Sequence, residues 1–181
     1  MPLTPLHFVF AWAIFLSMPR KWSFAGLSIG SIIPDLEVPF LYVTGWESGT
    51  GHGPLHSIFG ALTIDMLLAI LAVYLIYPSV AGLWETKFGT KWVHFGGVNI
   101  GDIDSFRAIA FGVFVGVSLH VAVDYLTHTT MPYLWPFSAP MATFSFARAT
   151  WWLLAVNILL LFILLLIIWR HLGRMENVRV A

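Results

Sequence analysis

Three stretches of this sequence are apolar over the length that a lipid bilayer requires, and they restrict the fold more than any other feature. A membrane-spanning helix needs roughly 20 mostly apolar residues. Residues 58–78, 106–127 and 150–169 meet that requirement. Only 10% of the 181 residues are charged, against about 25% in a typical soluble domain. The sequence therefore predicts an all-α integral membrane protein, in which residues 1–181 form a single transmembrane helical domain.

Two shorter apolar segments precede these three, so we expect a polytopic protein with five transmembrane helices. The first covers about residues 5–18, with Thr4 as N-cap and Pro5 at the first helical position. The second covers about residues 22–33 and ends before Pro34, because a proline disfavours helix at the preceding residue. Irregular backbone is expected from Asp35 to Tyr42, and loops at 43–53, 79–105 and 129–149.

The basic residues sort to one side of this five-helix arrangement. Arg148 is alone on one side, and the other side carries Arg20, Lys21, Lys87, Lys91, Arg107, Arg170, Arg174 and Arg179. Because cytoplasmic loops are rich in Lys and Arg, we expect a plasma-membrane protein with its N-terminus outside and its C-terminus in the cytoplasm. The formal net charge is zero, so nothing in the charge balance indicates a nucleic-acid partner.

Histidines and carboxylates recur at the ends of the apolar segments, and those considered as ligands below all fall on the expected outer side, whereas His94 and His171 fall on the cytoplasmic side and are excluded. Such groups are costly at membrane depth and usually have a role there. The chain has no cysteine, so a metal ion would need nitrogen and oxygen ligands. We expect a common pocket for two or three divalent ions, most simply Zn²⁺, held by His7, Asp35, His52, His56, His120, Asp124 and His128.

The sharpest pattern is His120, Asp124 and His128, which are four residues apart. Side chains at that spacing lie on one face of a helix, where they can bind one ion or let the carboxylate bridge two; the alternative is a buried hydrogen-bond network. His52 and His56 have the same spacing at a helix start, and the alternative for them is an interfacial pair without a ligand.

Asp35 and Glu37 follow Pro34 in a stretch where regular helix is not expected. Both can be metal ligands, or one can be a ligand and the other the general base; the alternative is an acid merely exposed at a helix end. We also expect Ser57 to orient a histidine, and consider Asp65 an additional ligand or a partner of one.

The order of these short motifs resembles one family of membrane proteins. His7, Gly30-Ser31, Pro34-Asp35, His52 with His56-Ser57, and His120 with Asp124 stand in the order found in membrane-bound metal-dependent hydrolases of the YdjM type. The resemblance extends over about residues 4–138 and, distantly, to zinc phospholipase C and P1 nuclease. It implies a helical fold, a multi-zinc centre and hydrolysis of phosphoesters.

These observations together predict a metal-dependent hydrolase of the extracytoplasmic side. Its expected substrate is a phosphoester of a membrane lipid or another amphiphile, and Glu37 or Asp35 is expected to take a proton from the attacking water. The alternative from another class is a divalent-metal transporter or metal-binding membrane protein that uses the same ligands. A bis-histidine haem protein is a third possibility. The sequence gives no indication of oligomeric state.

Overall fold

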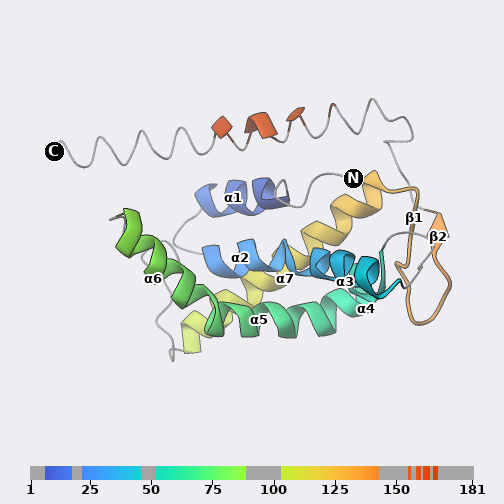
Figure 1. The fold of residues 1–181 in the computed structure, drawn as a ribbon, viewed down its shortest axis with the longest axis horizontal. Helices are drawn as coiled ribbons and strands as arrows, with labels where there is room; N and C mark the ends of the chain where they lie inside the picture. The colour runs from blue at the N-terminus through green and yellow to red at the C-terminus, as the bar shows by residue number, and fades with distance from the viewer. Residues whose placement is uncertain are drawn as a thin grey trace.

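The computed structural model describes residues 7–17, 22–45, 52–88 and 103–142, with some positions between 155 and 166. The α-helices are α1 (Phe8–Ser17), α2 (Phe24–Gly30), α3 (Glu37–Thr44), α4 (Ile58–Gly60), α5 (Met66–Leu75), α6 (Tyr77–Phe88) and α7 (Ile103–Thr127). Between them lie two short 3-10 helices, η2 (Ile33–Leu36) and η3 (Pro54–His56), and the π-helical segment η4 (Ala61–Asp65). The antiparallel strands β1 (Thr130–Met131) and β2 (Met141–Ala142) follow α7. Helix α2 contacts α1, α5 and α7, which surround it (Figure 1).

Two helices among the described residues are long and apolar enough to cross a bilayer. They are the continuous helix Ile58–Leu75 and the segment Ser105–Thr127 of α7. The pair Phe24–Gly30 and Ile33–Thr44 passes the same test jointly, with a bend of 43°, and makes a third span if the pair crosses as one. The described residues therefore support two or three spans and not five. Helix α1 has only 10 residues, and the expected last helix lies mostly outside the described residues.

Two segments that were expected to be irregular are helical, so these expectations were wrong. Helix α3 is regular from Glu37 onward, and α6 continues to Phe88, where a loop was expected from residue 79. The physical reason is where the prolines stand. Pro39 and Pro78 lie in the first turns of α3 and α6, where a backbone N–H has no intrahelical acceptor and its loss costs little.

The surface is far more apolar than that of a soluble protein, and many polar side chains are buried beside the apolar core. Many large apolar side chains are exposed, among them Leu67 at 60%, Leu75 at 71% and Val43 at 82%. The buried polar side chains are His7, Ser23, Ser28, Ser31, Glu37, His52, His56, Ser57, Asp65, His120 and Asp124. Acidic side chains are rarely fully buried in soluble proteins, and an extended exposed apolar surface marks contact with lipid or a partner. This distribution supports a membrane location.

Helices α2 and α7 pack at very close range through glycines. Gly26 and Gly30 are four residues apart on α2, as are Gly112 and Gly116 on α7, and this spacing of small residues lets membrane helices approach closely. A β-carbon at Gly116 would lie 2.5 Å from the carbonyl oxygen of Leu27. One at Gly30 would lie 2.6 Å from the carbonyl oxygen of Val113. The sequence pattern did not predict this contact.

Replacing Gly116 by valine is expected to push α2 and α7 apart and to destabilise the protein by about 1–3 kcal/mol, as overpacking of a close-packed interior does. Thermal unfolding of the protein in detergent measures the effect. Gly82→Val is the matched control, because a β-carbon at Gly82 on α6 meets no atom within 4 Å. Equal melting temperatures for the two variants would contradict the proposed role of the glycine contact.

Candidate metal centre

All seven expected ligands, and Glu37, lie at one end of the helix bundle. They come from several segments that are far apart in the sequence. His7 precedes α1, Asp35 lies in η2, Glu37 begins α3, His52 and His56 flank and end η3, His120 and Asp124 lie in the last turns of α7, and His128 follows it. The convergence that the sequence pattern predicted is thus present in the structure.

His120 is oriented by the close contact between α2 and α7. Its Nδ1 lies 2.8 Å from the carbonyl oxygen of Ser31, which immediately follows α2. A carbonyl only accepts hydrogen bonds, so Nδ1 carries the proton and donates it. The Nε2 lone pair then points toward Asp124, whose Oδ2 lies 3.0 Å away. This arrangement of a histidine is typical of metal ligands.

His56 is oriented in the same way by a carboxylate. Its Nδ1 lies 2.5 Å from Oε1 of Glu37 and donates to it. The same carboxylate accepts the backbone N–H groups of Gly53, at 2.6 Å to Oε1, and of Leu55, at 2.9 Å to Oε2. Glu37 is only 6% exposed. It therefore holds both the His56 ring and the segment that carries it, and leaves Nε2 of His56 directed into the centre.

Four donor atoms form a compact group around one point. Nε2 of His56 lies 3.4 Å from Nε2 of His120, 3.5 Å from Oδ1 of Asp35 and 3.4 Å from Oδ2 of Asp124. Nε2 of His120 lies 3.6 Å from Oδ1 of Asp35. A tetrahedral zinc ion with bonds of about 2.0–2.1 Å keeps its donors about 3.3–3.4 Å apart. The spacing of these four side chains fits that geometry.

The electrostatics of this group also favour a cation. Once both rings donate their Nδ1 protons elsewhere, two imidazole lone pairs and two carboxylates face one another. Burial by itself lowers the pKa of His56, but hydrogen bonds with Asp35 and Glu37 outweigh it and raise the pKa to about 9. The surroundings of His56 therefore stabilise positive charge. A divalent cation carries two positive charges, whereas a proton carries one.

A second group of donors shares Asp124 with the first. His52, Asp124 and His128 each offer a ligand atom within 4.8 Å of the others. Oδ1 of Asp124 lies 3.6 Å from Nδ1 of His128 and 3.7 Å from Nε2 of His7, whereas Oδ2 faces the first group. Nδ1 of His128 also lies 3.0 Å from the backbone carbonyl of Asp124, so it carries the proton, and Nε2 is the ring nitrogen left for an ion. The two oxygens of Asp124 thus face different groups of side chains, an arrangement in which one carboxylate can be shared between two ions.

His7 lies beside both groups without belonging to either set of mutually close donors. Its ring stacks on that of His120 with a centroid distance of 4.1 Å. Its Nδ1 is buried and has no hydrogen-bond partner. The side chain thus borders the second group and retains a ring nitrogen that no described contact uses.

Three further residues differ in part from the sequence expectations. The Ser57 hydroxyl was expected to orient a histidine, but it donates to the carbonyl of Pro54 and caps α4 by accepting from the N–H of Gly60. Asp65 is fully buried but belongs to neither donor group.

The role of the Ser31 carbonyl was missed, because a backbone acceptor leaves no signature in a sequence. Arg148 lies outside the described residues.

The family model described as YdjM inner membrane protein matches residues 3–179 of this chain. No curated protein and no solved structure matches it.

Proposed function

This chain belongs to the YdjM inner membrane protein family, and from its candidate metal centre we propose that it is an integral-membrane, metal-dependent hydrolase. The observation that carries the proposal is the spacing of the four donor atoms of Asp35, His56, His120 and Asp124, which fits a tetrahedral ion. The proposed substrate is a lipid phosphoester, because the centre is built from the ends of helices whose outer surfaces are apolar.

In this proposal two divalent ions, most simply Zn²⁺, share Asp124. The first would be held by Asp35, His56, His120 and Asp124, and the second by His52, Asp124 and His128 with His7 at its border. A bound divalent cation lowers the pKa of a water molecule toward about 7 and stabilises negative charge on a phosphoryl oxygen.

The two acidic residues considered as general bases have different surroundings. Glu37 accepts three hydrogen bonds, so we assign it the positioning of His56 rather than proton transfer. Asp35 directs Oδ1 toward the two histidines, and its Oδ2 has no hydrogen-bond partner. We therefore assign Oδ2 of Asp35 the acceptance of a proton from the attacking water.

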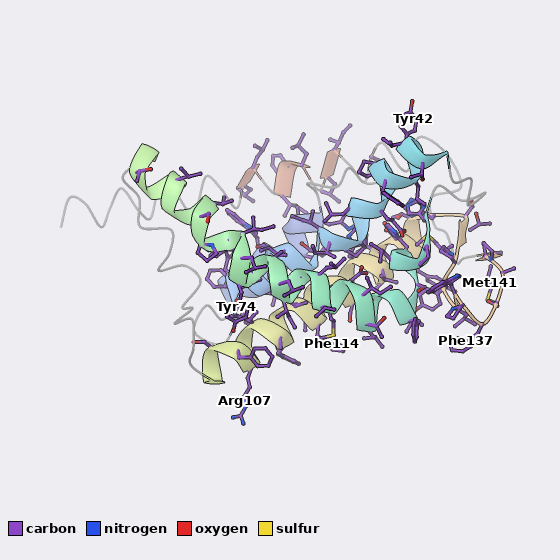
Figure 2. The ribbon with its side chains drawn as sticks, turned by 60° about the horizontal axis from the view of Figure 1, so that its bottom comes forward. Tyr42, Tyr74, Arg107, Phe114, Phe137 and Met141 are labelled. Carbon is purple, nitrogen blue, oxygen red and sulfur yellow. The ribbon has the colours of Figure 1, made fainter. Side chains whose placement is uncertain are left out.

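We propose that the centre faces the extracytoplasmic side. Arg107 projects from the end of α7 that is remote from the centre, whereas Tyr42 and Met141 lie near the opposite end (Figure 2). The positive-inside tendency places the Arg107 end in the cytoplasm. The chain has no cysteine, so a Tyr42→Cys variant has a single thiol. A membrane-impermeant maleimide should label this thiol in intact cells. Labelling only after cell lysis would show instead that the centre faces the cytoplasm.

The direct test of the function is metal analysis and a phosphoesterase assay on the same sample. Purified wild type is expected to hold two zinc ions per chain and to release the phosphorylated or unphosphorylated head group from phospholipids in mixed micelles. Chelation should remove the activity and added Zn²⁺ should restore it. Metal-free wild type, or metal-loaded protein that hydrolyses no phosphoester, would contradict the proposal.

One observation favours a metal transporter as a second candidate. Asp65 is fully buried within the span Ile58–Leu75, and neither of its carboxylate oxygens has a hydrogen-bond partner. A carboxylate beyond the centre is a feature that an ion pathway requires. Zinc uptake into proteoliposomes, without hydrolysis and abolished by Asp65→Asn, would favour transport over hydrolysis.

A further inference from the structure

An apolar groove of about 410 Å³ runs between α3 and the helix that contains η4 and α5. One wall is formed by Leu36, Phe40 and Leu41, and the other by Ile64 and Leu68. Pro54 and Leu55 of η3 also line it, and Glu37 is the one ionisable side chain among the described residues that do. The volume lies within the range of about 300–1,000 Å³ that is typical of small-molecule sites.

The groove opens into the apolar surface of the protein. Phe40 is 59% exposed and Leu68 is 40% exposed, and both belong to segments that are apolar enough to span a bilayer. We therefore expect membrane lipid to be what meets the groove from outside. A hydrocarbon chain suits its walls, since the carboxylate of Glu37 is engaged by N–H groups of its own chain.

The groove and the metal centre share a side chain. Glu37 lines the groove and also holds Nδ1 of His56, while Leu55 lines it and donates its N–H to the same carboxylate. The groove is thus lined by the side chain that orients the His56 ring of the metal centre.

We propose that this groove binds one acyl chain of the lipid substrate and aligns its phosphoester with the metal centre, an inference that rests on the proposed hydrolase function. The groove gives little hydrophobic gain over the bilayer, because lipid tails are as apolar as leucine. Its contribution is orientation, which holds the scissile bond near the reacting groups. The protein is therefore expected to discriminate between lipid substrates by their acyl chain as well as by their head group.

Photochemical labelling in nanodiscs tests the inference. The full-length protein is reconstituted with phosphatidylethanolamine and phosphatidylglycerol that contain a trace of a phospholipid with a diazirine in one acyl chain. After illumination, adducts are mapped by mass spectrometry. Label on Phe40 is expected to exceed label on Phe114, which is exposed on α7 away from the groove.

Two tryptophan variants provide the matched comparison. Leu68→Trp fills the groove and is expected to remove the label from Phe40. Leu67→Trp places the same side chain at the neighbouring exposed position of α5, which does not line the groove, and should leave the label unchanged. Equal labelling in both variants, or equal labelling of Phe40 and Phe114 in wild type, would overturn the inference. A cross-link from the groove to a second copy or to residues 150–169 would also overturn it.

Zinc content, measured on the same samples, separates this inference from the hydrolase proposal. Preferential groove labelling in protein that holds no zinc supports the acyl-chain site while the hydrolase proposal fails. Zinc-loaded, hydrolytically active protein without groove labelling retains the hydrolase and rejects the acyl-chain site.

Discussion

Asp124→Ala is expected to remove both metal ions and all phosphoesterase activity, the largest effect of any single substitution in this protein. Oδ2 of Asp124 faces His56 and His120, and Oδ1 faces His128 and His7, so each ion loses a ligand. Removing even an outer-shell partner typically lowers metal affinity by about 10–100-fold, and the loss of a shared ligand should exceed that. Elemental analysis of purified protein measures the zinc content, and a chelator competition measures the affinity.

Asp65→Asn is the matched control for Asp124→Ala. Both aspartates are buried on membrane-spanning helices, but Asp65 lies in neither donor group. The Asp65→Asn protein should keep the zinc content and hydrolytic activity of wild type. Wild-type zinc content in Asp124→Ala would refute the shared-ligand arrangement, and equal zinc loss in both variants would indicate general damage to the bundle.

Glu37→Gln is expected to lower zinc affinity by about 10–100-fold, the usual consequence of losing the partner of a metal-ligating histidine. A glutamine has one acceptor oxygen in place of two, so it cannot serve His56, Gly53 and Leu55 together. A buried N–H left without a partner costs about 1–3 kcal/mol. The variant should therefore also unfold at a lower temperature than wild type.

The same variant distinguishes a positioning role for Glu37 from a catalytic one. If Glu37 positions His56, zinc affinity falls, and activity returns when Zn²⁺ is supplied in excess. If Glu37 is instead the general base, zinc affinity stays at the wild-type value while activity stays low at saturating Zn²⁺. Thr44→Val, which removes an exposed hydroxyl from the same helix α3, should change neither quantity.

The candidate site could be predicted from the sequence to a large extent because membrane chemistry makes its residues conspicuous. An ionisable side chain at membrane depth is costly enough to need a reason, so His120, Asp124, His52 and His56 stood out. The spacing of four on one helix placed His120 beside Asp124, and the structure has them 3.0 Å apart.

What the sequence could not show depends on contacts between distant segments. The carbonyl of Ser31 reaches His120 only because glycines let α2 approach α7. The hydrogen bonds from Gly53 and Leu55 to Glu37 likewise come from the fold of residues 52–57 onto α3. The helix starts at Glu37 and Tyr77 were missed because the effect of a proline depends on its position. It breaks a helix in the interior but is tolerated in the first turn, and the sequence alone did not show which case applied.

The most direct test of the metal centre is an anomalous difference map, recorded at the zinc absorption edge from crystals of the zinc-loaded protein. We expect two peaks that flank the carboxylate of Asp124. One should lie about 2.0–2.1 Å from Nε2 of both His56 and His120, and the other beside His52 and His128. Peaks elsewhere in the protein, or zinc-loaded crystals with no peak between His56 and His120, would contradict the account.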